Sequence, residues 1–224
     1  MAVTQNLLQA HETPHDTCLR ALYSYRSKQV QTLKSKLTVH PNFPNSMMNT
    51  CQNCTINEVD TMDHMLGQSA FPEYSVHPKN LFPCCTYCNR KKSDNYVDEH
   101  GKRRFLNLFL DELPSSQYLH VEFGQNWLPR FYLEQPEDVD DNTYSLIESH
   151  YSELDLLNRF RDSSHQIIST FRMIIRSYGH VDNLHMILRT QIEGLEPLLG
   201  ANHREIVLKR ALAASDAFIA ECWE

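Results

Sequence analysis

The sequence predicts an α+β fold in which a small core is flanked by an N-terminal helix and a C-terminal helical bundle. Two Cys-x-x-Cys pairs, at positions 51/54 and 85/88, enclose a polar segment. Apolar residues recur at helical spacing over residues 15–38, and again from Asn142 to the C-terminus. Strand-like alternation lies between these stretches, so helices and strands occupy separate parts of the chain.

The composition is that of an ordinary globular protein. The chain has 224 residues, of which 41% are hydrophobic and 22% are charged, enough for one or two domains. No apolar run approaches the roughly 20 residues that cross a membrane, and the N-terminus lacks the features of a signal peptide. Seven cysteines, an odd number, in a metal-like pattern favour a reducing environment. We therefore expect a cytoplasmic protein with no membrane partner.

We expect four consecutive parts. They are an N-terminal helical segment (1–45), a core (46–112), a β-hairpin with a linker (113–140) and a helical bundle (141–224). In the first part, the apolar stripe of residues 15–38 predicts one helix, which ends before Pro41 and Pro44.

Within the core, residues 42–50 are expected to be a linker into Cys51. Residues 55–62 alternate enough to predict a short strand, and Leu81 to Pro83 is expected to be its return strand. A loop over 67–79 joins the two. The helix that follows is expected over residues 86–93.

Past the core, alternation on both sides of Gly124-Gln125-Asn126 predicts a β-hairpin over residues 117–134. Residues 135–142 are acidic and are expected to form a linker. The remaining stripes predict a bundle of three or four helices. Its expected stops are Gly179 and Gly200, and its expected N-caps are Asp182 and Asn202.

The two cysteine pairs indicate a metal site. A Cys-x-x-Cys turn places two sulfurs on one ion, so two turns supply the four ligands of a tetrahedral zinc: Cys51, Cys54, Cys85 and Cys88. Cys85 follows Cys54 by 31 positions, a longer gap than the roughly 15–20 residues of a simple zinc ribbon. The excess is an insert that carries further polar groups. A disulfide framework is the alternative, and the absence of extracellular signals disfavours it.

Those polar groups resemble a known pattern. Asp63-His64, Asn80 and Cys85-x-x-Cys88-Asn89-x-x-Lys92, over about residues 48–95, resemble the HNH endonuclease family in its zinc-supported form. The resemblance implies the ββα-metal fold, a β-hairpin followed by a helix around one divalent metal. It also implies that Asn80 orients the site by holding the backbone or the His64 ring. Asn89 stands where the family often has His, and it keeps an oxygen ligand.

Residue types alone favour the same chemistry. Hydrolysis of a phosphodiester needs a base for water and a cation for the developing charge. His64 suits the base, since an ordinary imidazole is mostly neutral at working pH. Asp63 and Asn89 offer oxygen ligands, which suit Mg²⁺ or Mn²⁺. Because Asp63 and His64 are adjacent, an extended strand would point them to opposite faces, and one shared site requires a break at the strand end.

The charge distribution indicates where nucleic acid would bind. The net charge is −7, which argues against DNA binding by the whole surface. Residues 1–40 carry a charge of +3, whereas residues 111–224 carry −10. A broken basic run beside the motif is the expected nucleic-acid contact: Arg90, Lys91, Lys92, Lys102, Arg103 and Arg104.

The sequence therefore predicts an HNH endonuclease that cleaves nucleic acid, DNA rather than RNA. A compact HNH protein with a helical C-terminal part resembles the nuclease subunits of bacterial anti-phage defence systems, for example the Septu and retron-associated kinds. That resemblance implies an ATPase partner, and the C-terminal helices are also a candidate oligomer surface. The alternative is a non-catalytic, zinc-stabilised module that binds nucleic acid or protein, in which Asp63, His64 and Asn89 are structural.

Overall fold

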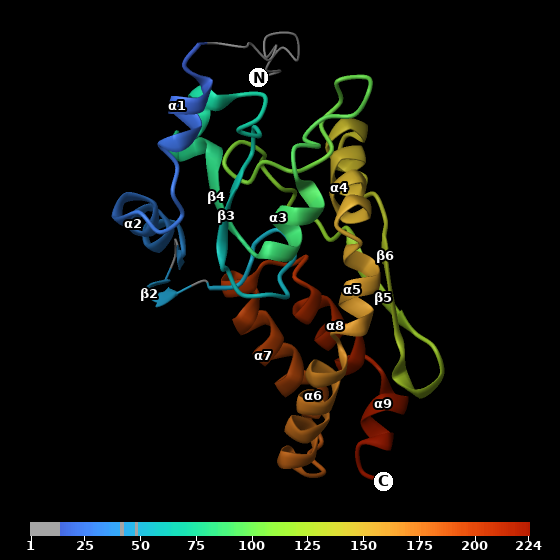
Figure 1. Ribbon diagram of the computed structural model, residues 1–224. Helices are drawn as coiled ribbons and strands as arrows, with labels where there is room; N and C mark the ends of the chain where they lie inside the picture. Colours follow the sequence, from blue (N-terminus) through green and yellow to red (C-terminus); the bar gives the residue numbers. More distant parts are fainter. Residues whose placement is uncertain (1–13, 41–42, 48) are drawn as a thin grey trace. The chain divides into compact units, whose positions relative to one another are not determined.

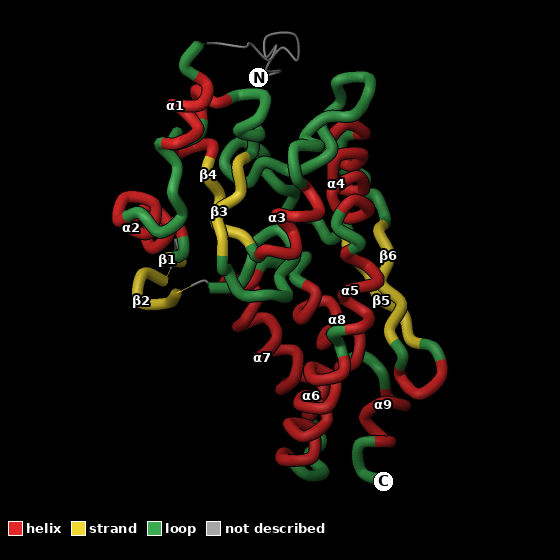
Figure 2. The backbone as a smooth tube through the Cα atoms, viewed as in Figure 1, coloured by secondary structure: helices red, strands yellow, loops and turns green. Residues whose placement is uncertain are grey.

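The computed structural model describes residues 14–40, 43–47 and 49–224. The chain divides into two units, each taken by itself (Figure 1). Unit 1 comprises Met1–Glu112 and Ser145–Leu154, and unit 2 comprises Leu113–Tyr144 and Asp155–Glu224. Both mix helices with two-stranded sheets, as Figure 2 shows, and the α+β class is confirmed. Within the described residues, no helix is long and apolar enough to cross a membrane.

The N-terminal segment of unit 1 contains two short helices in place of the single predicted helix. They are α1 (Asp16–Ala21) and α2 (Lys28–Leu37). The prediction of one helix over 15–38 was wrong because the chain turns between them, where the Ser27 hydroxyl accepts the Val30 N–H and starts α2 as a new helix.

The predicted linker over 42–50 is partly strand. β1 (Val39–His40) pairs with β2 (Phe43–Met47) in an antiparallel sheet. Residues 42 and 48 of that prediction lie outside the described residues, as do residue 41 and residues 1–13 of the N-terminal segment.

A β-hairpin followed by a helix forms the centre of unit 1. β3 (Thr61–His64) pairs antiparallel with β4 (Leu81–Cys84), and α3 (Thr86–Lys92) follows at once and lies against β3. The return strand and the helix are confirmed. The strand predicted over 55–62 was wrong in its bounds, because residues 49–59 bond to one another around the first cysteine pair and β3 begins only at Thr61.

The two faces of β3 meet different parts of the chain. Met62 packs with Val30 of α2 and Leu81 of β4 in a buried apolar cluster. The side chains of Thr61 and Asp63 point to the face opposite Met62, and both accept hydrogen bonds from α3. The alternation of the strand therefore separates a face towards the N-terminal segment from a face towards α3.

The loop between β3 and β4 contains two single turns of 3₁₀ helix, η1 (Pro72–Tyr74) and η2 (Pro78–Asn80). The final part of α4 (Asp141–Glu153) also belongs to unit 1. The sequence placed this segment in the C-terminal bundle.

Unit 2 begins with the predicted hairpin. β5 (Leu119–Phe123) pairs with β6 (Pro129–Leu133), and the connection contains the 3₁₀ turn η3 (Gln125–Trp127). Asn126 and Trp127 have positive φ angles of 56° and 60°, which a short polar side chain such as Asn tolerates best. The hairpin is confirmed.

The C-terminal part contains more helices than predicted. After α4 come α5 (Leu156–Asp162), α6 (His165–Tyr178), α7 (Leu184–Leu199), α8 (Arg204–Ala213) and α9 (Asp216–Glu221). Gly179 and Gly200 end α6 and α7 with φ angles of +66° and +92°, as expected of helix stops. The predicted caps were each displaced by one position, to Asn183 and His203. Asn202 Oδ1 instead accepts the backbone N–H groups of Tyr118 and Leu119, where β5 begins.

His203 makes the stability of unit 2 depend on pH. Its Nδ1 accepts the Glu205 N–H at the start of α8, and burial lowers the pKa of the ring to about 4. An unfolded chain protonates this ring near pH 6.5, so the stabilisation is complete above that pH and is lost as the pH falls towards 4.

We expect the loss to reach about 2–3 kcal/mol. Urea unfolding at pH 7, 5.5 and 4.5 measures it. His203→Asn keeps a capping oxygen without a titrating ring, so its profile should be flatter by that amount. Equal pH dependence in the two proteins would show that His203 is not the titrating group.

Candidate functional site

Four buried cysteines form the clearest site in the molecule. The sulfurs of Cys51, Cys54, Cys85 and Cys88 all lie within 4.8 Å of one another, and those of Cys54 and Cys85 are 3.9 Å apart. A tetrahedral zinc with bonds of about 2.3 Å separates its sulfurs by about 3.8 Å. The four sulfurs therefore fit a single ion, and the cluster can hold a metal such as zinc.

Local backbone structure brings these sulfurs together. In the first pair the Thr55 N–H donates to the Cys51 carbonyl at 2.7 Å, which closes a tight turn. In the second pair Cys85 precedes α3, and its sulfur accepts the Cys88 N–H at 3.5 Å. The Asn57 amide also donates to the Cys85 sulfur, at 3.6 Å. The cluster thus joins the segment before β3 to the start of α3.

The four thiols share protons unequally. Hydrogen bonds from Cys51, Cys54 and Cys88 hold the pKa of the Cys85 thiol far below its usual range, and the Cys51 thiol lowers the pKa of Cys54 to about 6. Hydrogen bonds among the thiols raise the pKa values of Cys51 and Cys88. Because zinc binds the thiolate form, an ion at this position would displace the remaining thiol protons.

Asp63 lies deep on the α3 face of β3. Its side chain is 3% exposed, and the Lys92 ammonium contacts Oδ1 at 3.2 Å. Among the residues that the structure describes, Oδ2 is buried without a hydrogen-bond partner. Burial outweighs the attraction of Lys92 and raises the pKa of Asp63 to about 6. An unpaired buried carboxylate oxygen is costly, and a cation would satisfy it.

Lys92 is therefore not on the surface, where the sequence placed it as a nucleic-acid contact. Its ammonium also donates to the His64 carbonyl at 2.6 Å and to the Ser93 carbonyl at 3.4 Å. The sequence offered no signal for this, since a lysine at the end of a short helix is usually solvated.

His64, the last residue of β3, turns its ring to the other face. Nε2 lies 2.8 Å from the Ser75 carbonyl, and the Tyr23 ring meets the imidazole edge-on with centroids 4.5 Å apart. A carbonyl only accepts, so Nε2 carries the proton and Nδ1 keeps its lone pair. Burial lowers the pKa of His64, which favours the neutral ring. The Gln68 amide nitrogen lies 2.8 Å from Nε2 and 3.3 Å from Nδ1, contacts that the sequence did not reveal.

Asn80 and Asn89 are also held by nearby backbone. Asn80 Oδ1 accepts the Leu66 N–H at 2.7 Å, and its amide nitrogen donates to the Leu66 and Tyr74 carbonyls. Asn80 thereby shapes the chain just after His64. On α3, the Asn89 amide nitrogen contacts Thr61 Oγ1 at 3.3 Å and the Met62 carbonyl at 3.5 Å. These contacts use the nitrogen and leave the amide oxygen for another partner.

Asp63 and Asn89 thus lie on the same face of β3, and Lys92 bonds both to Asp63 and to the His64 carbonyl at the end of the strand. These contacts leave the His64 ring on the opposite face, and no break interrupts β3 before His64. Asp60 has a structural role: its Oδ1 accepts the Thr86 N–H at 2.6 Å and caps α3.

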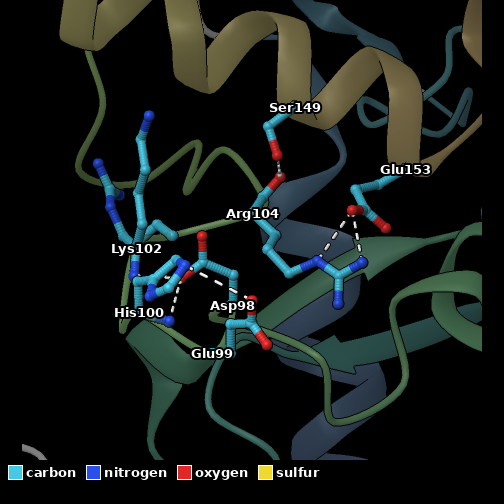
Figure 3. Close-up of a pocket in the computed structure, with 8 residues that line it drawn as sticks. Asp98, Glu99, His100, Lys102, Arg104, Ser149 and Glu153 are labelled. Carbon is cyan, nitrogen blue, oxygen red and sulfur yellow. Dashed lines mark hydrogen bonds and ion pairs between the residues drawn. The ribbon is translucent and has the colours of Figure 1, made fainter.

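The remaining basic residues of the predicted nucleic-acid contact differ in how exposed and how paired they are. Arg90 and Lys91 on α3, and Lys102, are exposed. Arg103 is paired with Asp111 at 2.8 Å, and Arg104 with Glu153 at 2.5 Å. Arg104 and Glu153 line a pocket of about 550 Å³ together with other basic and acidic side chains. Figure 3 shows the ion pair between these two residues. Half of the predicted basic run is therefore already neutralised within the protein.

Comparison with known proteins gives a distant likeness. The chain is 24% identical over 179 residues to Protein ea31 of Escherichia phage lambda. The match covers 73% of this chain and 60% of that protein, so the chain spans less than two thirds of the length of that relative. No protein-family model matches the chain, and no solved structure matches it. The name of that protein describes no activity.

Proposed function

We propose that this protein is a metal-dependent endonuclease of the HNH type, which cleaves phosphodiester bonds in nucleic acid, DNA rather than RNA. The observation that carries the proposal is the buried Oδ2 of Asp63, which has no hydrogen-bond partner among the described residues, on a strand whose Thr61 and Met62 contact Asn89 of α3. A buried carboxylate oxygen without a donor suits a hard divalent cation, and the amide oxygen of Asn89 offers a second ligand of the same kind. The four-cysteine cluster supports the same unit, because one ion would tie the segment before β3 to the start of α3.

In this proposal the four cysteines hold a structural zinc, and Asp63 and Asn89 hold Mg²⁺ or Mn²⁺. The second ion, when bound, stabilises the negative charge on the phosphate and on the leaving oxygen. Lys92 provides a fixed positive charge beside Asp63, which offsets part of the cost of keeping that carboxylate ionised in a buried position.

His64 serves as the general base. Its Nε2–H donates to the Ser75 carbonyl, which fixes the ring and leaves the Nδ1 lone pair to take a proton from water. The water oxygen then attacks phosphorus, and the bond to the leaving oxygen breaks. Because Asp63 and the His64 ring lie on opposite faces of β3, the reacting phosphate must sit at the end of the strand, where pairing with β4 closes at Leu81.

The exposed side chains Arg90, Lys91 and Lys102 are the proposed contacts to the phosphate backbone. The proposal also includes regulation by an ATPase partner within an anti-phage defence system. This part is supported only by the HNH resemblance. The charge of −10 over residues 111–224 is compatible with a protein partner for that part of the chain.

One specific observation favours the alternative of a non-catalytic module. The buried Asp63–Lys92 pair and the Asn89 contacts to β3 already give these residues structural partners. In that case the cysteine cluster would stabilise a binding domain, and no cleavage would occur.

Incubation of supercoiled plasmid with the 224-residue protein and Mn²⁺ distinguishes a nuclease from a non-catalytic module. We expect nicking that EDTA abolishes and that Asp63→Asn slows at least about 100-fold, since an amide removes the anionic ligand. Asp60→Asn is the matched control: it keeps an oxygen to cap α3 and should leave the rate unchanged. Zinc content and circular dichroism verify that both variants are folded. No metal-dependent nicking by the unchanged protein, or equal rates in the two variants, would contradict the proposal.

A further inference from the structure

The ring of His150 connects α4 to the first cysteine pair. The residue is 4% exposed, and its Nε2 lies 3.1 Å from the carbonyl of Asn53, between Cys51 and Cys54. On the other side of the ring, Nδ1 accepts the Leu106 N–H at 3.3 Å. The first bond needs a proton on Nε2 and the second needs a lone pair on Nδ1, so the ring is neutral in one tautomer. Burial, which lowers the pKa of His150 to about 4, is consistent with this state.

The atom that His150 binds controls the direction of Cys54. The Asn53 carbonyl and the Cys54 N–H belong to one planar peptide group, so fixing the carbonyl fixes the plane that leads into Cys54. The Cys54 N–H itself donates to the Cys51 carbonyl at 3.2 Å. Thr55, which follows, has a φ angle of +51°, a conformation that costs a non-glycine residue about 1 kcal/mol or more. Such a turn persists only where its neighbours hold it.

The ring is itself held in place. The Ser149 hydroxyl donates to the Arg104 carbonyl at 3.0 Å, and the Arg104 guanidinium binds Glu153 one helical turn further along α4 (Figure 3). Together with the Leu106 bond, these contacts fasten this part of α4 to residues 104–106. The Nε2–H therefore points at Asn53 from a fixed position.

We propose that His150 is a positioning residue of the four-cysteine metal centre. It holds the peptide before Cys54 in the orientation that directs the Cys54 sulfur at the ion, and it slows release of the ion. This role depends on the cysteine cluster and not on nuclease activity, so its test is independent of cleavage.

Two substitutions test the two hydrogen bonds of the His150 ring one at a time. His150→Gln places an amide nitrogen near the position of Nε2 and can still donate to Asn53, but it loses the acceptor for Leu106. His150→Asn places an amide oxygen near Nδ1 and keeps that acceptor, but it cannot reach Asn53. Each variant loses one buried hydrogen bond, so both should weaken the folded state to a similar extent. His100→Gln, at an exposed histidine of unit 1, is the control.

The readout is the rate at which zinc leaves the full-length protein for an excess of a chromogenic chelator, with Co²⁺ absorption as a count of bound thiolates. We expect His150→Asn to release zinc about tenfold faster or more, whereas His150→Gln and His100→Gln stay close to the unchanged protein. Urea unfolding of the zinc-free proteins measures the loss of fold stability separately. Equal release rates for the Gln and Asn variants, or a rate for His150→Asn equal to that of the unchanged protein, would overturn the proposal.

Discussion

Replacing His64 with alanine is expected to lower the rate of plasmid nicking by about 100- to 10,000-fold, the usual contribution of a general base. In the proposed mechanism, Nε2–H of His64 donates to the Ser75 carbonyl, and Nδ1 is the atom that takes a proton from water. Binding of the plasmid and the zinc content should stay unchanged, because the ring does not contact the cysteines. The rate of nicking at saturating Mn²⁺ measures the effect.

His77→Ala is the matched control, since His77 is an exposed histidine in the same loop region and packs edge-on against Tyr74. The pH profile gives a second check. Burial lowers the pKa of His64, so activity in the unchanged protein should persist below pH 6.5 before protonation of the base abolishes it. A His64→Ala protein that nicks plasmid as fast as His77→Ala would rule out His64 as the base.

Loss of one cysteine ligand is expected to have the largest effect on stability. Cys85→Ala removes the sulfur that accepts hydrogen bonds from Asn57 and the Cys88 backbone and lies 3.9 Å from Cys54. We expect zinc stoichiometry to fall from one ion to near zero, and the free energy of unfolding of unit 1 to fall by about 3–5 kcal/mol. Zinc analysis of the purified protein and urea unfolding with and without EDTA measure both quantities.

The neighbouring Cys84 offers a close control. It is also fully buried, but it lies on β4 outside the cluster. Cys84→Ala should keep one zinc per chain and cost only a small amount of packing energy. If Cys84→Ala and Cys85→Ala lost zinc and stability equally, the stabilisation would come from ordinary packing and not from an ion.

Short-range signals predicted much of the hairpin–helix unit. The Cys-x-x-Cys spacing identified the four clustered sulfurs, and Gly179 and Gly200 marked helix ends, because each signal depends on residues a few positions apart. The continuous helix over 15–38 was wrong for the opposite reason. Its stripe was real, but the hydroxyl of Ser27 favoured a new helix start over continuation.

Long-range contacts account for what the sequence did not reveal. Lys92 has the pattern of a surface lysine, and only the fold brings it to Asp63, 29 positions away. The same holds for Arg103 and Arg104, whose acidic partners follow 8 and 49 positions later. A histidine within a helical stripe has no feature that marks it as a hydrogen-bond donor to a metal-binding turn. His150 is 97 positions from Asn53, beyond the range of any local pattern.

The membership of Ser145–Leu154 in unit 1 has a consequence for synthesis of the protein. A ribosome releases the chain from the N-terminus, so the cysteine pairs and the Asp63–His64 strand emerge long before His150 does. Unit 1 cannot complete its fold until residue 154 has left the exit tunnel, by which time residues 113–144 of unit 2 are also outside. Nascent chains that stall earlier would therefore lack a finished core, and we expect them to be open to proteolysis and poor at retaining zinc.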